Sequence, residues 1–202
     1  LNLAAEDNIR VANLTNPAQI FHAFRRQVLS NQRKPLVVMT PKSLLRHPKA
    51  VSDLEDFSSG SFQKVIKDSS AASPEHAPYV IFCSGKVYYE LDDARQKDPD
   101  LAQVPIHRLE QIYPFPDAEI QEILSDYPEG FEVRWVQEEP ANMGAWRFVR
   151  EQFESGLLDK FKLIRISRPE SASPATGSGA SHKLEQARLL ERALEKGSFA
   201  AK

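Results

Sequence analysis

Polar side chains follow several apolar runs of this chain, at points where binding or chemistry often takes place. Ser84-Gly85-Lys86 follows one such run and opens a helical pattern, so its backbone amides could face an anion. It is not a Walker A loop, because Val80 stands where that motif needs glycine and Val87 stands where it needs Ser or Thr. A tight strand-to-helix turn with a solvated lysine is the simpler interpretation.

Two adjacent carboxylates, Glu138 and Glu139, end another apolar run. Paired carboxyl groups can carry out acid–base catalysis where burial raises the pKa of one of them. Neighbouring residues of a strand point to opposite faces, however, so the two need not share a site. An interface or loop-bracing role is favoured, because Asn142 and Gly144 suit a turn and Trp146 is an anchor of the kind enriched in interfaces.

Nucleophilic and metal chemistry find little support in the sequence. Cys83 lies within an apolar run, where a buried and inert thiol is the usual case. The histidines have no metal-ligand spacing, and there is no Gly-x-Ser-x-Gly motif of a serine hydrolase. Basic side chains recur at loops and helix ends, where they either form a solvated surface or converge on a phosphate or carboxylate. They are Arg25, Arg26, Arg46, Lys49, Lys64, Arg165 and Arg168.

Alternating apolar runs and helical patterns must position these groups. Apolar runs predict strands at 9–12, 35–40, 79–84, 104–109, 132–137 and 162–167. Periodic segments predict helices at about 16–30, 86–97, 116–127, 144–155 and 181–197. The runs at 35–40 and 79–84 are typical of strands buried on both faces. We therefore expect an α/β fold: a mostly parallel five- to six-stranded sheet with helices on both faces.

Two segments interrupt the alternation. Residues 46–77 are long and polar, with a mobile stretch expected at 69–74 and a short helix near 61–66. Residues 169–180 are rich in Ser, Pro, Ala and Gly and predict an extended crossing loop. Neither segment is typical of a domain boundary, so residues 1–202 are expected to form a single domain.

Bulk composition limits the classes of function. The chain has 202 residues, of which 41% are hydrophobic and 27% charged, as in a soluble globular domain. A net charge of -2 gives no electrostatic argument for binding nucleic acid or an anionic membrane. One cysteine cannot form an internal disulfide, which suits a reducing compartment. No apolar stretch approaches the roughly 20 residues that span a bilayer. The absence of an initial methionine indicates the cut edge of a longer protein.

Several motifs, taken together, resemble one enzyme family. They are MTPKSLLR (39–46), CSGKVYY (83–89), EQIYPFP (110–116) and QEEPANMGAW (137–146), supported by 5–8, 16–19, 25–27 and 171–177. The chain is similar, nearly end to end, to the C-terminal domain of the thiamine-diphosphate-dependent first component of 2-oxoglutarate dehydrogenase complexes. That domain in turn resembles the C-terminal domain of transketolase.

The resemblance implies a non-catalytic role for this chain. In that family the whole enzyme, an oxidoreductase of the tricarboxylic acid cycle, decarboxylates 2-oxoglutarate on thiamine diphosphate. It then passes the succinyl group to a lipoyl arm of the dihydrolipoamide succinyltransferase component. Thiamine diphosphate and Mg²⁺ bind in upstream domains of a homodimer, through a Gly-Asp-Gly and Asn-Asn motif that is absent here. The resemblance therefore implies no catalytic or metal-binding residue in this chain, and a location in bacterial cytoplasm or the mitochondrial matrix.

The resemblance also names candidate interface and effector residues. The strand end at 137–146 matches a region near the subunit interface of that family. The resemblance therefore implies interface contacts by Glu138, Glu139, Asn142, Gly144 and Trp146.

Some family members bind acetyl-CoA or AMP in this domain. Arg26 and Gln111 match the acetyl-CoA site, and a lysine and a serine of that site are exchanged here as Ser61 and Lys64. Arg10 replaces a threonine, and Ala118-Glu119 replaces an arginine pair. Losing two guanidinium groups and gaining a carboxylate should weaken polyphosphate binding, which leaves a smaller anionic nucleotide open as the ligand.

Two functions remain open from the sequence. One is an assembly and regulatory domain of such an enzyme. The alternative is a free-standing nucleotide or acyl-CoA binding module, which the recurring arginines and Ser84-Gly85-Lys86 would suit.

Overall fold

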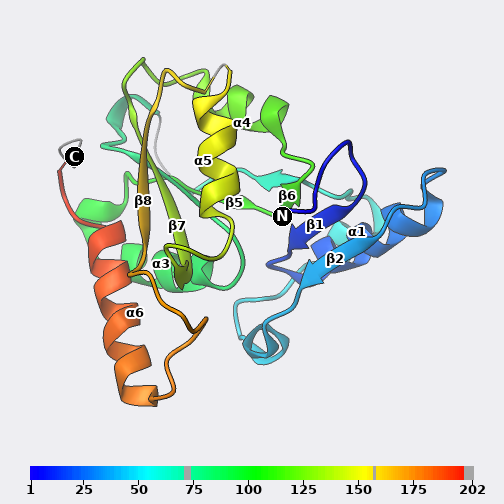
Figure 1. Cartoon of the computed structure of the whole chain (residues 1–202). Helices are drawn as coiled ribbons and strands as arrows, with labels where there is room; N and C mark the ends of the chain where they lie inside the picture. Colours follow the sequence, from blue (N-terminus) through cyan, green and yellow to red (C-terminus); the bar gives the residue numbers. More distant parts are fainter. Residues whose placement is uncertain (71–73, 157, 198–202) are drawn as a thin grey trace.

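The chain folds around two mixed β-sheets rather than one. The structure, a computed structural model, describes residues 1–70, 74–156 and 158–197 (Figure 1). One sheet has three strands in the order β2-β1-β6, and the other has five in the order β3-β5-β4-β7-β8. The strands are β1 (Arg10–Asn13), β2 (Leu36–Met39), β3 (Val65–Ile66), β4 (Val80–Cys83), β5 (Ile106–Leu109), β6 (Gln111–Tyr113), β7 (Glu132–Pro140) and β8 (Lys162–Arg168).

The predicted α/β class is confirmed, whereas the prediction of a single, mostly parallel sheet is wrong. Each sheet contains an antiparallel pair, β1 with β6 and β3 with β5, beside its parallel strands. The helices are α1 (Pro17–Leu29), α2 (Leu54–Ser58), α3 (Val87–Lys97), α4 (Asp117–Leu124), α5 (Trp146–Glu154) and α6 (Gly179–Ala193). Short 3-10 turns occupy Lys42–Arg46, Pro74–His76 and Pro99–Leu101.

Helices cover both faces of the five-stranded sheet. Strands β4 and β7 pair in parallel with each other, β4 also pairs in parallel with β5 and β7 with β8, and every residue of β4 is buried. Apolar residues of α4 and α5 pack with Phe82 and Trp135 on one face. Those of α3 and α6 pack with Ile81 and Val136 on the other face. This half of the molecule has the layered core expected for alternating strands and helices.

A buried arginine joins the middle of this sheet to the last helix. Arg134 of β7 is fully buried and donates hydrogen bonds to the backbone carbonyls of Ala193, Glu195 and Gly197, at 2.9, 2.9 and 2.7 Å. Its charge also faces Glu132, whose carboxylate accepts from Nε at 2.8 Å. Arg134 therefore satisfies carbonyl groups that the end of α6 would otherwise leave without partners.

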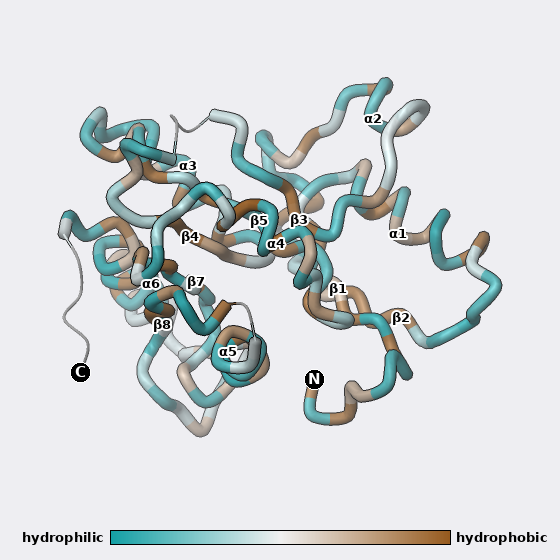
Figure 2. The backbone as a smooth tube through the Cα atoms, turned by 90° about the horizontal axis from the view of Figure 1, so that it is seen from above, coloured by the Kyte–Doolittle hydropathy of each residue, from teal (hydrophilic) through white to brown (hydrophobic). Residues whose placement is uncertain are grey.

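The three-stranded sheet forms a separate lobe, which we call the three-stranded lobe: β1, β2, β6 and α1. Asn16 caps α1 by accepting from the Gln19 N–H at 2.9 Å, and Pro17 occupies the first turn, as the sequence predicts. The core under α1 is small, with Ala12, Leu14 and Ala23 buried. Figures 1 and 2 show α1 and β2 extending away from the rest of the molecule.

The prediction that residues 35–40 form a strand buried on both faces is wrong. β2 pairs only with β1 and is the edge of its sheet, so Val37 and Met39 are 43% and 49% exposed. A strand of this composition usually lies in the middle of a covered sheet.

One residue, Glu110, separates the two sheets. The expected strand at 104–109 is β5, and after Glu110 the chain continues at once as β6 in the other sheet. The Glu110 carbonyl accepts from the Asn13 N–H at 2.9 Å, and the Glu110 N–H donates to the Lys64 carbonyl at 2.9 Å. A change of sheet across one residue carries no periodicity signal, so the sequence pattern missed β6.

The polar segment after β2 also differs from expectation. The prediction of a helix near 61–66 is wrong, because Val65 and Ile66 form β3, which pairs with β5. A short helix, α2, begins instead at Leu54, where the Asp56 carboxylate accepts from the Asp53 N–H at 3.0 Å.

The remaining loops and helices follow the sequence more closely. Of the mobile stretch expected at 69–74, residues 71–73 lie outside the described residues. The crossing loop runs from Pro169 to Ser178, and α6 starts two residues before the expected 181. None of the helices in the described parts of the chain has the length and apolar character required to cross a bilayer.

Candidate functional site

The candidate effector residues Arg26, Ser61, Lys64 and Gln111 gather around one segment, 61–64. The Arg26 guanidinium lies over the ring of Phe62, 3.9 Å from its centre. Gln63 is held by Gln19, whose side-chain oxygen accepts from the Gln63 N–H at 3.0 Å. The Lys64 carbonyl accepts from the Gln111 N–H at 3.0 Å. Ser61 is exposed at the start of the segment.

Arg26 carries the strongest sign of an anion site. Its Nε and one terminal nitrogen are shielded from solvent and have no hydrogen-bond partner. Burial, and then the neighbouring charge of Arg10, lower the pKa of the Arg26 guanidinium. Arg10 itself donates to Gln27 at 2.9 Å and to Ser30 at 3.3 Å. Guanidinium nitrogens that are shielded from solvent and lack partners are costly, and an anion that accepts from them would remove that cost.

Lys64 and Gln111 already have partners in the chain. Lys64 pairs with Glu119 at 2.8 Å, and Glu119 is one of the residues that replace the arginine pair of the resembling family. The Gln111 side chain is buried and donates to the Pro114 carbonyl at 2.8 Å. The site therefore offers one unsatisfied cation, Arg26, beside Arg10, and not an extended cluster.

The residues proposed as interface contacts surround a loop that Gln137 organises internally. The Gln137 side-chain oxygen accepts from the Trp135 indole at 3.0 Å and from the Trp146 N–H at 2.8 Å. Its amide donates to the Met143 carbonyl at 2.8 Å. Gly144 has a φ of +67°, and a Cβ there would lie 2.7 Å from the Gln137 amide nitrogen. A glycine is needed at this close approach.

Only part of this loop faces outward. Trp146 is 8% exposed and packs in the chain's own core, so its ring is not an exposed anchor. Asn142 bonds to the backbone of Ser171 in the crossing loop, donating at 2.9 Å and accepting at 3.0 Å. Glu139 and Asn142 are half-buried and Gly144 is exposed, so contacts with another subunit at these positions stay a prediction.

Glu138 and Lys86 form an ion pair at the carboxyl end of the sheet. Lys86, expected to be solvated, donates to Glu138 and lies 3.6 Å from Glu90. The Gln186 amide of α6 donates to Glu138 at 3.2 Å. Burial raises the pKa of Glu138, while the bond from Lys86 acts in the opposite direction. Ser84-Gly85-Lys86 is thus a turn, with Gly85 at a φ of +72°, that fastens α3 to β7 and α6.

Glu110 is a buried titratable group that the sequence did not single out. It is fully buried, and its carboxylate accepts from the N–H and the hydroxyl of Thr15, at 2.9 and 2.5 Å. Burial raises the pKa of Glu110 to about 7. Glu110 stands among polar residues such as Arg108 and Gln111, so no clear signal in the sequence indicates its burial. Phe62, the platform beneath Arg26, left no such signal either.

Two other groups that could react, the Cys83 thiol and the His107 imidazole, are buried in the fold. The Cys83 thiol is fully buried, as predicted, and burial raises its pKa. His107 is buried, which lowers its pKa to about 4, and its Nδ1 accepts from the Asp68 N–H at 3.0 Å. Among residues 1–70, 74–156 and 158–197, no three His, Cys, Asp or Glu side chains lie close enough to hold a metal ion.

Comparison with known proteins identifies the family. The sequence profile described as 2-oxoglutarate dehydrogenase C-terminal matches residues 51–194. The chain is 46% identical to the 2-oxoglutarate dehydrogenase E1 component of Cupriavidus necator, over 97% of this chain and 20% of that protein. It is 43% identical to the E1 component of Haemophilus influenzae and 42% identical to that of Azotobacter vinelandii, each over 96% of this chain and 21% of the relative. The chain thus spans about a fifth of the length of these relatives. It belongs to the 2-oxoglutarate dehydrogenase E1 component family, in which it matches the C-terminal part.

Proposed function

We propose that this chain is an assembly and regulatory domain of a 2-oxoglutarate dehydrogenase and performs no catalytic step by itself. The match of 97% of the chain to only 20% of an E1 component carries the proposal. The full-length enzyme would decarboxylate 2-oxoglutarate on thiamine diphosphate and Mg²⁺ held by upstream domains. It would then transfer succinyl to the lipoyl group of its succinyltransferase partner.

The burial and pairing of the reactive side chains support a non-catalytic role. Cys83 is buried, and Glu138 is paired with Lys86. Glu110 is enclosed between the two sheets with both oxygens bonded to Thr15. None of these groups has the accessible position that a nucleophile or a general base requires. The likeness to the transketolase C-terminal domain, the homodimer and the cellular compartment remain parts of this proposal.

The catalytic part of the proposal has a direct test. The 202-residue chain with thiamine diphosphate and Mg²⁺ should release no CO₂ from 2-oxoglutarate, whereas the full-length enzyme should. Release by the chain alone would overturn the proposal. The free-standing binding module draws no support from the relatives, since each is about five times as long as the matched region.

The regulatory part of the proposal assigns an anion to Arg26. A single phosphate, as in AMP, matches the one unsatisfied guanidinium and the nearby Arg10. Acetyl-CoA carries more phosphate charge, but Lys64 is neutralised by Glu119. The binding of AMP should therefore exceed that of acetyl-CoA.

Titration calorimetry of the chain with each ligand tests this assignment. Arg26→Ala should weaken AMP binding by about 1–3 kcal/mol, the range for a charged hydrogen bond. Arg33→Ala, at an exposed arginine beyond α1, is the matched control and should leave affinity unchanged. Glu119→Gln should free Lys64 and strengthen acetyl-CoA binding. Equal affinities of the wild type and Arg26→Ala would remove Arg26 from the site, and no heat at millimolar ligand would overturn the regulatory role.

A further inference from the structure

Helix α1 presents polar side chains to its own lobe. Gln19 and His22 are buried on its inner face, and His22 Nε2 lies 2.7 Å from the Asp56 carbonyl oxygen. Arg26, on the same face, lies over Phe62, and Gln27 bonds to Arg10. Of the buried residues of α1, only Ala18 and Ala23 are apolar. An isolated amphipathic helix would place its large apolar residues here.

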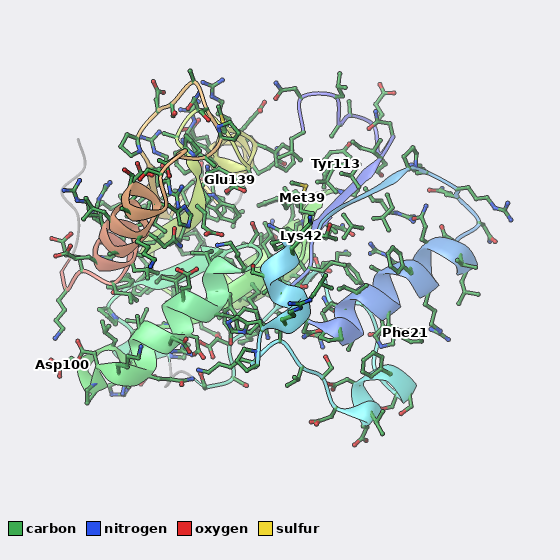
Figure 3. All side chains as sticks on the ribbon, turned by 90° about the horizontal axis from the view of Figure 1, so that it is seen from below. Phe21, Met39, Lys42, Asp100, Tyr113 and Glu139 are labelled. Carbon is green, nitrogen blue, oxygen red and sulfur yellow. The ribbon has the colours of Figure 1, made fainter. Side chains whose placement is uncertain are left out.

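Ile20 packs against the core under α1, but three other large apolar side chains of the helix point the opposite way. Phe21, Phe24 and Val28 are 42%, 53% and 76% exposed. Their spacing of i, i+3 and i+7 places them on one helix face, which we call the outer face of α1. Figure 3 shows Phe21 between α1 and the short helix α2, where its ring meets that of Phe57 at 5.7 Å. That contact covers only one end of the outer face, so Phe24 and Val28 stay exposed to solvent.

The exposure of apolar groups is concentrated in this part of the chain. Among the described residues, every large hydrophobic side chain that is exposed, except Leu184, lies before residue 55. Val37 and Met39 of the edge strand β2 belong to this set. Large exposed apolar side chains that lie in one part of a chain indicate that another polypeptide covers some of them.

The comparisons indicate which polypeptide covers it. The C-terminal family profile begins at residue 51, so β1, α1 and β2 all lie ahead of it. The relatives that match the whole chain are about five times as long, and the matched part is C-terminal. In those proteins the preceding polypeptide joins the fold through β1, which lies in the same sheet as β2 and beneath α1. The part of each relative that precedes the match is therefore the polypeptide of the same chain that is available to cover the outer face of α1.

We propose that the outer face of α1 is an intramolecular docking surface that packs against the upstream part of the same E1 polypeptide. The surface on that part should be apolar, with a carboxylate opposite Arg25, which is exposed beside Phe24 and Phe21. A symmetric contact between two copies fits less well, since it would bring two Arg25 charges to the same apolar seam. The inference rests on the proposed function in one respect, that the chain is part of a full-length enzyme.

Thiol accessibility in the full-length enzyme tests the proposal. Cysteines outside this region are replaced by serine, and Cys83 gives no background because it is fully buried. Val28→Cys is compared with Leu184→Cys, a control on α6 whose parent side chain is 53% exposed. We expect the thiol at position 28 to react about 10-fold more slowly than the control, or slower still, because it is covered. Phe24→Cys gives a second reading of the same face. Both thiols should react alike in urea.

Dilution separates the upstream domains from a second copy of the chain. Protection at position 28 should stay constant across concentrations at which sedimentation shows subunits dissociating. Equal labelling of the two positions, or protection lost in step with dissociation, would overturn the proposal. Labelling reports coverage and not turnover, so CO₂ release by the same preparation tests the proposed function separately.

Discussion

The five-stranded sheet and the three-stranded lobe differ in how far each is complete within this chain. The larger sheet has helices on both faces and buries Trp135, Val133 and Val136 almost fully. The lobe has one helix on one face, a core of few buried residues and an edge strand that leaves Met39 half exposed. The difference shows that a sequence can fold as one unit while only one of its two sheets carries a self-sufficient core.

The largest difference between the regions should appear in the core of the larger sheet. Trp135→Ala removes a side chain that is 1% exposed and leaves Gln137 without its indole partner. We expect a loss of about 3–5 kcal/mol in the free energy of unfolding, measured by urea denaturation. A cost below about 1 kcal/mol would break the comparison, because a well-packed core cannot lose a tryptophan so cheaply.

The junction between the regions should make stability depend on pH. The pKa of Glu110 is about 7 in the folded chain against an ordinary value of 4.5, so between these values the native state binds more protons than the unfolded state. Stability should therefore fall as pH rises from about 4.5 to 7, in total by on the order of 3 kcal/mol.

Glu110→Gln should remove that part of the pH dependence. Denaturation curves collected at several pH values measure the slope. Glu129→Gln, at an exposed carboxylate, is the control and should keep the wild-type slope. A wild-type slope that persists in Glu110→Gln would assign the pH dependence to another group.

The loop held by Gln137 should show a smaller, purely local effect. Gly144→Ala and Gly130→Ala both place alanine at a positive φ, +67° and +77°, but only at Gly144 does the new Cβ meet a neighbour, the Gln137 amide. We expect about 1–2 kcal/mol of destabilisation from the backbone alone at each site, and more at Gly144. Thermal melts of the two variants measure the difference, and equal shifts would mean that Gln137 can move aside.

The smallest effect should come from the outer face of α1. Phe24→Ala in the 202-residue chain should change the free energy of unfolding by no more than about 0.5 kcal/mol, because the ring is half exposed. Urea denaturation of the same variant in the full-length enzyme should show a larger loss. A large loss in the chain alone would mean that the lobe depends on this ring internally, and would weaken the contrast between the two regions.

Sequence patterns predicted the regular elements of the larger sheet well. The run at 79–84 became the fully buried β4, and the helix after Gly85 became α3, because local periodicity and burial agree there. The lobe was predicted less well, since the composition of 35–40 reflects a covered strand and β2 is an uncovered edge in this chain. The composition of a strand reflects what covers it in the whole protein, and this chain contains only part of what would cover β2.

The resemblance predicted which residues form the candidate site, but it did not predict which contacts those residues make. Arg26 and Gln111 do converge on 61–64, yet nothing in the sequence shows that Lys64 is taken by Glu119 or that Phe62 supports Arg26. Such contacts join residues far apart in the chain, and no local pattern encodes them. The candidate contacts at 138–146 likewise depend on a fold detail, the enclosure of Trp146 in its own core.

The bonds from Arg134 to the end of α6 limit how the protein can be shortened. A chain ending before Ala193 would take away three carbonyl oxygens that Arg134 uses and leave its charge inside the sheet. The last residue of α6 and the residues that follow it thus bind a charge on β7, which is three strands from the edge strand β3 and next to the other edge strand, β8. Tags or fusions should be appended beyond Gly197, so that Arg134 keeps all three carbonyl acceptors.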